Sequence, residues 1–336
     1  MTATATRRVA IPTALAMPRA APDDGCVQEL AGESMGTTWS VKFVGSRASR
    51  QMLQRIIPLA LARVVAQMSP WETDSDLSHF NRLAPKAWQT LPPEFAQVIA
   101  AALRIAAESD GAYDPTVGAL VDLWGFGPSG PRPAPPADAI ARLHRACGFQ
   151  QLRFDPARRR LCRHDTGPLD LCGIAKGFAV DLVMERLREY GIHHALVEIG
   201  GELSGSGIKP DGHPWWVEID QPATDGAVTA PMLIALHGLA VATSGCERGF
   251  ARDARYFSHT LDPRTGYPIV NGMVTATVLH RSCMEADAYA TALMVLGPER
   301  AIDFAAAREL AALIRFTGAD GLITERATPA LEAMLA

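Results

Sequence analysis

Near its carboxyl-terminal end the sequence contains the run Ser258-His259-Thr260-Leu261-Asp262-Pro263-Arg264-Thr265-Gly266, followed further on by Glu285-Ala286-Asp287-Ala288-Tyr289-Ala290-Thr291. Pro263 and Gly266 are typical of a turn, which holds side chains in place without strand pairing. The second run is typical of a helix, on which Asp287 and Thr291 stand four residues apart and so share one face. A carboxylate beside a hydroxyl suits Mg²⁺, especially where a phosphate supplies the other oxygen ligands. The two runs together indicate half of a nucleotide-diphosphate site.

The composition is that of an ordinary globular protein with a substantial core. The chain has 336 residues, of which 48% are apolar and 20% charged. A net charge of −4 and the lack of a dense Lys/Arg run give no reason to expect a nucleic-acid partner. The six cysteines show no C-x-x-C pair, so reduced thiols are expected. No apolar run approaches the length of a membrane span, so no integral membrane segment is expected.

The amino-terminal residues raise the question of export. Arg7 and Arg8 precede an apolar stretch and resemble a twin-arginine signal, but that stretch is short and interrupted by Pro12 and Pro18. We therefore expect a cytoplasmic protein, with periplasmic export as the alternative. Residues 1–30, rich in Ala, Pro and Thr, predict a disordered tail, and residues 31–336 predict a single domain.

The order of the expected elements is typical of an α+β fold rather than a doubly wound α/β fold. Apolar spacing predicts helices over residues 47–68, 93–108, 137–147, 176–190, 284–296 and 298–309. Pro58 is expected to kink or split the first of them. Strands are expected over residues 38–43, 152–154, 195–199, 215–220, 232–237, 240–243, 274–280, 313–316 and 321–324. Residues 71–82 predict an irregular segment, and the proline-rich residues 128–136 predict a surface loop.

A second candidate for the site is the run Asp170-Leu171-Cys172-Gly173-Ile174-Ala175-Lys176-Gly177 at the start of a predicted helix. Small residues before a helix let the backbone approach a ligand, and the helix amino terminus favours an anion. Lys176 adds a positive charge. The run matches neither a Walker A loop nor a G-x-G-x-x-G fingerprint, so phosphate binding and a purely structural turn both remain open.

Further candidates are weaker when taken singly. The loop Ala112-Tyr113-Asp114 could border a ligand or be only a turn. For Met35 and Trp71, core packing is favoured over contact with a ligand ring. Glu198 and Glu202 could form a carboxylate pair for acid–base chemistry, although nothing in the sequence fixes their geometry. His259, in its turn of small polar residues, is the best candidate for proton transfer.

Seven segments of the chain, in order, resemble the pattern of the ApbE family of FAD:protein FMN transferases. They are Met35-Gly36-Thr37-Thr38-Trp39, Ser75-Asp76-Leu77-Ser78-His79-Phe80-Asn81, Tyr113-Asp114-Pro115-Thr116-Val117-Gly118, Asp170 to Phe178, Thr243-Ser244-Gly245, Phe257 to Gly266 and Ala286 to Ala292. The resemblance spans residues 32–296 and implies an ApbE-like fold. In that fold, mostly antiparallel or mixed sheets carry flanking helices, and the site lies in a cleft between lobes.

The resemblance also implies roles for individual residues. Asp170 and Lys176 would contact FAD. Asp287, Thr291 and the backbone carbonyl of Gly173 would hold Mg²⁺. The flavin nucleotide would be lined by Met35, Trp71, Ala112, Tyr113, Asp114 and Leu261. His259 would be the base that takes the proton from a Thr or Ser hydroxyl of an acceptor protein.

The implied reaction is an in-line phosphoryl-type transfer. The acceptor hydroxyl attacks the phosphorus on the FMN side of FAD, and AMP leaves. Two departures from the family pattern stand out: Cys172 replaces a Gly, and Ala290 replaces an acidic residue that some members carry near the metal. The alternatives are an FAD-binding or flavin-delivery protein without transfer, and a Mg²⁺-dependent FAD hydrolase that yields FMN and AMP.

Overall fold

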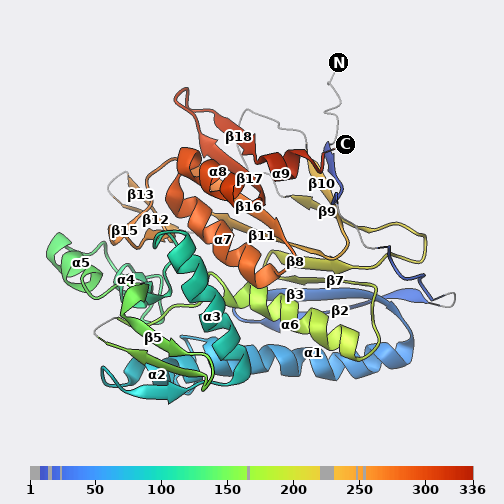
Figure 1. Cartoon of the computed structure of the whole chain (residues 1–336), viewed down its shortest axis with the longest axis horizontal. Coiled ribbons are helices and arrows are strands. Elements are labelled where there is room, and N and C mark those ends of the chain that lie inside the picture. The colour runs from blue at the N-terminus through green and yellow to red at the C-terminus, as the bar shows by residue number, and fades with distance from the viewer. Residues whose placement is uncertain are drawn as a thin grey trace.

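The computed structural model describes residues 8–13, 17–22, 25–164, 167–219, 231–246, 249–252 and 255–335. Its centre is an eight-stranded sheet in the order β18-β17-β16-β11-β8-β7-β3-β2, in which every neighbouring pair is antiparallel (Figure 1). These strands are β2 (Cys26–Ser34), β3 (Thr37–Gly45), β7 (Ala195–Ile199), β8 (Glu202–Ser206), β11 (Leu239–Gly245), β16 (Met273–His280), β17 (Ala311–Thr317) and β18 (Ile323–Ala327). The two edge strands come from opposite ends of the sequence.

Helices cover one face of this sheet (Figure 1). They are α1 (Arg47–Met68), α3 (Pro93–Glu108), α6 (Ala175–Glu189), α7 (Cys283–Leu296) and α8 (Pro298–Ala307). Helix α7 packs on β11 and β16, and α6 packs against both α7 and α1. Because α7 is apolar on nearly all sides, it is buried along almost its whole length, as expected for a helix surrounded by other elements.

The other face of the sheet carries a second apolar cluster. There, a three-stranded sheet contains β1 (Arg8–Ala10), β10 (Met232–Leu236) and β9 (Trp215–Ile219), with β1 parallel to β10 and β9 antiparallel to it. Its buried residues Ile234 and Leu236 pack with Leu279 and Leu313 of the central sheet. The short helix α9 (Pro329–Glu332) closes the chain. The central sheet is therefore apolar on both faces.

The remaining elements form a smaller region beside α3 and α7 (Figure 1). It contains α2 (Asp76–Arg82), α4 (Gly118–Leu123), α5 (Ala137–His144) and the sheet of β4 (Trp88–Thr90), β6 (Arg160–Arg163) and β5 (Leu152–Asp155). It also contains the hairpins β12 (Gly249–Arg252) with β13 (Arg255–Ser258) and β14 (Leu261–Asp262) with β15 (Tyr267–Pro268). A third apolar cluster, centred on Leu120, Trp124, Ile140 and Leu261, holds these hairpins to α4 and α5.

The structure confirms the α+β prediction and corrects two of its details. Helix α1 is a single helix with Pro58 inside it, so the predicted split does not occur. The segment expected to be irregular contains α2, whose first turn is capped by Ser75, because its side chain accepts a hydrogen bond from the Ser78 amide at 3.0 Å. Helix α2 is short and polar outside, and its buried side chains Leu77 and Phe80 are too few to show a helical period.

The amino-terminal region also differs from the prediction. Strand β2 begins at Cys26, and β1 pairs with β10, so part of the expected tail forms ordered structure. A three-residue strand has no sequence signature of its own, because its pairing is decided by a distant partner. Arg7, half of the twin-arginine pattern, lies outside the described residues, whereas Arg8 starts β1.

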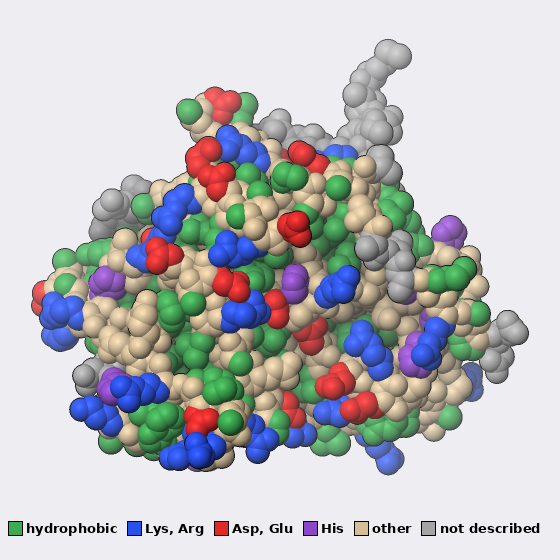
Figure 2. Space-filling view, viewed as in Figure 1, with side chains coloured by type: hydrophobic (Ala, Val, Ile, Leu, Met, Phe, Trp, Pro, Cys, Tyr) green, Lys and Arg blue, Asp and Glu red, His purple; other side chains and the backbone are tan. Residues whose placement is uncertain are grey.

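Two surface properties follow from the composition. On the face shown in Figure 2, Lys and Arg side chains are interspersed with Asp and Glu, without a large patch of one sign. Such a face offers no basic track for a nucleic-acid backbone. Within the described residues, no helix has both the length and the apolarity needed to cross a bilayer.

Candidate functional site

Helix α7 brings Asp287 and Thr291 to the glycine-containing turn that precedes α6. The Thr291 Oγ1 atom would lie 2.9 Å from a Cβ placed on Gly173, so only a glycine leaves room at this position. The Thr291 hydroxyl is also 3.3 Å from that of Ser244 on β11. Asp287 is buried, and its Oδ2 accepts a hydrogen bond from the Gly177 amide at 3.1 Å. The turn before α6 thus meets α7 twice, with Gly173 against Thr291 and Gly177 against Asp287.

Lys176, in the first turn of α6, is paired with the buried carboxylate of Glu202 on β8. Gly177 next to it packs directly on α7, where any side chain would collide with the carbonyl oxygen of Cys283. This close approach of α6 to α7 keeps Lys176 beside Asp287. The acid–base pair of Glu198 with Glu202 does not form, because Glu198 instead accepts a hydrogen bond from the Gly201 amide at 2.9 Å.

Two buried carboxyl groups, those of Glu202 and Asp287, lie at the contact of α6, α7 and β8. Burial, and after it the charge of Asp287, raises the pKa of Glu202 to about 8 against the opposing effect of Lys176. Burial also raises the pKa of Asp287, an effect that Lys176 and the Gly177 amide oppose. The Glu202 Oε2 atom has no hydrogen-bond partner among the described residues. Two buried carboxylates that share one lysine make this a favourable place for an added cation.

Asp170 lies at the other end of the same turn. Its Oδ1 accepts a hydrogen bond from the Cys172 amide at 2.7 Å, and its own amide donates to the Pro115 carbonyl at 2.8 Å. Burial raises the pKa of Asp170, while the hydrogen bonds from Cys172 and the nearby His259 lower it. The Asp170 turn is thereby tied to the loop that begins at Ala112, and His259 lies near it.

The Ala112-Tyr113-Asp114 loop is buried next to these groups. Burial raises the pKa of Tyr113 well above its usual value, and the nearby charges of Asp287 and Asp170 act in the same direction. The Tyr113 side chain therefore lies near both carboxyl groups. The Tyr113 hydroxyl has no hydrogen-bond partner among the described residues. Asp114 shapes the loop itself, because its Oδ1 accepts hydrogen bonds from the Thr116 amide at 2.8 Å and hydroxyl at 2.7 Å.

His259 follows directly after β13 and is half-buried. Its ring is edge-on to that of Phe126, with 6.4 Å between centroids. Leu261, two residues on, is buried in the third apolar cluster and fixes the turn. Asp262 bonds both the amide and the guanidinium of Arg264 at 2.8 to 2.9 Å, so its role is to shape the turn.

Two further predicted residues have different surroundings. Met35, in the turn between β2 and β3, is partly buried and packs against the main core, as expected. Trp71 is 55% exposed, so its predicted core packing is wrong. It lies in the connection between α1 and α2, where its amide bonds the Ser69 hydroxyl at 3.2 Å. An exposed tryptophan leaves a large flat face open for contact with a partner.

The donor atoms around Gly173 fit a hard cation. No group of three or more His, Cys, Asp or Glu side chains that could hold a metal occurs within the described ranges. The expected site is of another kind, because it uses one carboxylate, one hydroxyl and one backbone carbonyl. Gly173 lies against Thr291, and Asp287 is buried one helical turn earlier on α7, so the residues present offer oxygen donors of the kind that Mg²⁺ prefers.

Asp181 is a supporting residue that the sequence alone did not identify. From α6, its carboxylate accepts hydrogen bonds from the Ser282 hydroxyl at 2.7 Å and from the amides of Cys283 and Met284 at 2.9 and 3.0 Å. These groups form the amino terminus of α7, so Asp181 fixes the helix that carries Asp287. No sequence signal marks it, since its partners are about a hundred residues away.

We expect Asp181→Ala to lower the free energy of unfolding by about 2 kcal/mol, because three donors at the start of α7 lose their buried acceptor. Asp181→Asn keeps one acceptor oxygen and should lose less. Urea unfolding followed by circular dichroism measures both. The control is Asp303→Ala at an exposed site on α8. If Asp181→Ala matched that control, Asp181 would not support α7.

Comparison with known proteins shows the family to which the chain belongs. The family model described as the ApbE family matches residues 35–314. A Haemophilus influenzae protein named FAD:protein FMN transferase is 35% identical over 308 residues, which is 89% of each chain. A Vibrio cholerae protein of the same name is 38% identical over 298 residues, covering 87% of this chain and 88% of the relative.

Solved structures give the same result. The apo form of the Pseudomonas stutzeri flavinyl transferase ApbE is similar with a TM-score of 0.84 at 37% identity, covering 92% of this chain and 97% of that one. The flavin transferase ApbE from Vibrio cholerae has a TM-score of 0.84 at 36% identity, covering 92% and 99%. Sequence and fold therefore show that this chain belongs to the ApbE family.

Proposed function

We propose that this protein transfers the FMN part of FAD to a Thr or Ser hydroxyl of an acceptor protein, with release of AMP and with Mg²⁺ as cofactor. The observation that carries the proposal is the convergence of Gly173, Asp287 and Thr291 beside Asp170 and His259. The relatives named FAD:protein FMN transferase support the transfer of FMN to a protein.

In this proposal the turn before α6 receives the pyrophosphate of FAD. The amino terminus of α6 and Lys176 supply positive charge for the phosphate oxygens, and Gly173 lets the backbone come close. Bound Mg²⁺ would neutralise phosphate charge and stabilise the charge that develops on the leaving phosphate. Asp287, Thr291 and the Gly173 carbonyl would hold it. Tyr113 and Leu261 would border the flavin nucleotide, and Trp71 would offer its exposed face.

His259 is the proposed base. The acceptor hydroxyl loses its proton to the His259 imidazole as its oxygen forms a bond to the phosphorus on the FMN side. The bond between that phosphorus and the bridging oxygen breaks, and the oxygen leaves as part of AMP. FMN remains joined to the acceptor through a phosphoester. Asp170, which lies near His259, would favour the protonated imidazole that this step produces.

The test is to incubate the protein with FAD, Mg²⁺ and a candidate acceptor protein, and to measure protein-bound flavin and free AMP. The proposal expects both, in equal amounts, and neither when EDTA removes the metal. If AMP and free FMN form but no flavin is bound to the acceptor, the protein is an FAD hydrolase and not a transferase. If FAD binds tightly but neither product forms, the protein is instead one that binds or delivers flavin without transferring it. The cytoplasmic location expected from the sequence belongs to the same proposal, because it sets which acceptors are available.

A further inference from the structure

Lys176 has two buried carboxyl groups close to it. Its Nζ atom is paired with Oε1 of Glu202, whose side chain is buried. The amide of Gly177, the next residue, donates to Asp287 Oδ2 at 3.1 Å, so Asp287 lies beside the backbone of Lys176. The charge of Lys176 acts on Asp287, where it opposes the rise in pKa that burial causes. The lysine therefore pairs with Glu202 while a second carboxylate lies nearby.

Glu202 is held in place by the central sheet. It begins β8 directly after Gly200 and Gly201, which have positive φ values of 61° and 99° and so turn the chain in a way that favours glycine. Strand β8 pairs with β7 on one side and with β11 on the other. The Oε2 atom of Glu202 has no hydrogen-bond partner within the described residues. Because a buried carboxylate is costly without a cation, Lys176 stabilises Glu202 where it stands.

The backbone around Lys176 is fixed as firmly. A side chain on Gly177 would collide with the carbonyl oxygen of Cys283, so α6 and α7 are in direct contact there. The Cys283 thiol in turn donates to the Leu203 carbonyl of β8 at 3.6 Å. The side chain of Lys176 is 27% exposed, and its long stem is flexible. Of the three charged groups, the lysine is thus the one that can change its position.

The position of Lys176 decides how much charge Asp287 has for a metal ion. A lysine and a metal ion that bind the same carboxylate compete, because each neutralises the same negative charge. With Glu202 present, one positive and two negative groups leave one negative charge for an added cation. Without Glu202, Lys176 and Asp287 neutralise one another.

We propose that Glu202 is a positioning residue that takes the charge of Lys176 and so keeps Asp287 available to the metal ion. This inference rests on the proposed function, because it concerns the proposed Mg²⁺ site. In this role Glu202 acts through Lys176 and does not bind the metal itself. The ammonium group stays at the start of α6, where the pyrophosphate of FAD is proposed to bind.

The test measures binding of Mn²⁺, which prefers the same oxygen ligands as Mg²⁺ and gives an electron paramagnetic resonance signal when free. The protein is titrated without FAD, and Mn²⁺ bound by wild type beyond that bound by Asp287→Asn belongs to the site. Glu202→Gln should weaken this binding by about tenfold or more, because Lys176 then pairs with Asp287. Glu202→Gln combined with Lys176→Met should bind within about threefold of wild type, because no lysine is left to compete.

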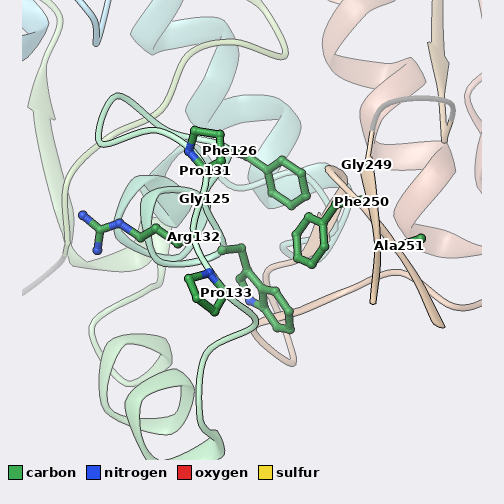
Figure 3. A pocket seen from close by; sticks show the side chains of 9 residues that line it. Gly125, Phe126, Pro131, Arg132, Pro133, Gly249, Phe250 and Ala251 are labelled. Atoms are coloured by element: carbon green, nitrogen blue, oxygen red, sulfur yellow. The ribbon is translucent and has the colours of Figure 1, made fainter. Parts of the chain in front are cut away.

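The matched control releases a cation at another place. Among the described residues that line a cavity of about 610 Å³ between residues 124–133 and β12, Arg132 is the only charged one (Figure 3). Its side chain is 44% exposed, and its Nη2 atom lies 3.6 Å from Asp122 Oδ2. Asp122→Asn frees this arginine and should leave Mn²⁺ binding unchanged. Glu198→Gln, which keeps an acceptor for the Gly201 amide, should do the same.

A crystal structure of Glu202→Gln tests the position of the lysine directly. We expect Lys176 Nζ within about 4 Å of an Asp287 carboxylate oxygen, the usual limit for an ion pair. A lysine that stays beside residue 202 would overturn the proposal. So would a combined variant that binds Mn²⁺ as weakly as Glu202→Gln, since Lys176 would then not be the competitor.

The outcome also separates this inference from the proposed function. If wild type bound no more Mn²⁺ than Asp287→Asn, the role of Glu202 and the metal assignment would both be wrong. If Mn²⁺ binding followed the expected pattern but no flavin became bound to an acceptor protein, the role of Glu202 would stand and the transfer function would be overturned.

Discussion

Asp287→Ala is expected to abolish Mg²⁺-dependent release of AMP from FAD, with a loss of at least about a hundredfold. Asp287 is 3% exposed and is the only carboxylate among the three proposed metal-holding groups. Without it, the Thr291 hydroxyl and the Gly173 carbonyl offer only neutral oxygens. The measurement is AMP release as a function of Mg²⁺ concentration.

Two variants separate charge from packing at this position. Asp287→Asn keeps the size of the side chain and an oxygen for the Gly177 amide, so it should fold normally while losing Mg²⁺ dependence. Asp303→Asn, at an exposed carboxylate on α8, should behave as wild type. If Asp287→Asn folded and kept its activity and its response to Mg²⁺, the metal assignment would be wrong.

His259→Ala is expected to bind FAD normally and to lose transfer to the acceptor by about 10² to 10⁴-fold, the usual contribution of a general base. The ring of His259 packs edge-on against Phe126, which belongs to neither α6 nor α7, so its removal should leave the contact of those two helices unchanged. The two readouts are flavin fluorescence quenching for binding and the rate of protein-bound flavin formation for transfer.

The control for this prediction is His213→Ala, because His213 is exposed in the turn between β8 and β9. It should leave both readouts unchanged. A parallel loss of FAD binding in His259→Ala would show that the histidine holds the nucleotide. Transfer at the wild-type rate would remove it from the mechanism altogether.

Much of the fold was predictable from local patterns. Helix α3 has the predicted bounds, since Pro93 sits in its first turn and Gly111 follows its end. Helix α7 was marked by its long apolar run, and strand β7 by a short run of mostly apolar residues. Helix α2 was missed, because seven residues with only two buried apolar side chains give no clear period. Strand β1 was missed, because its existence depends on β10.

The site was predictable to the extent that its residues form short local runs. Asp287 and Thr291 share a face of α7 because of their spacing, and the turn at Gly173 was marked by its small residues. The contact of Lys176 with Glu202 was not predictable, because it depends on the register of β8 beside β7. The same holds for Asp181, whose partners begin another helix.

The edges of the central sheet have a consequence for how the protein is made. Strand β2 is among the first described segments to leave the ribosome, and β18 is among the last. Helix α7, which packs between α6 and the sheet, is also made late. Until that helix emerges, the sides of α6 and β11 that pack against it are exposed. Contacts between segments far apart in the sequence form slowly. Before the last third of the chain is made, the nascent protein therefore exposes apolar surface that can aggregate or bind chaperones.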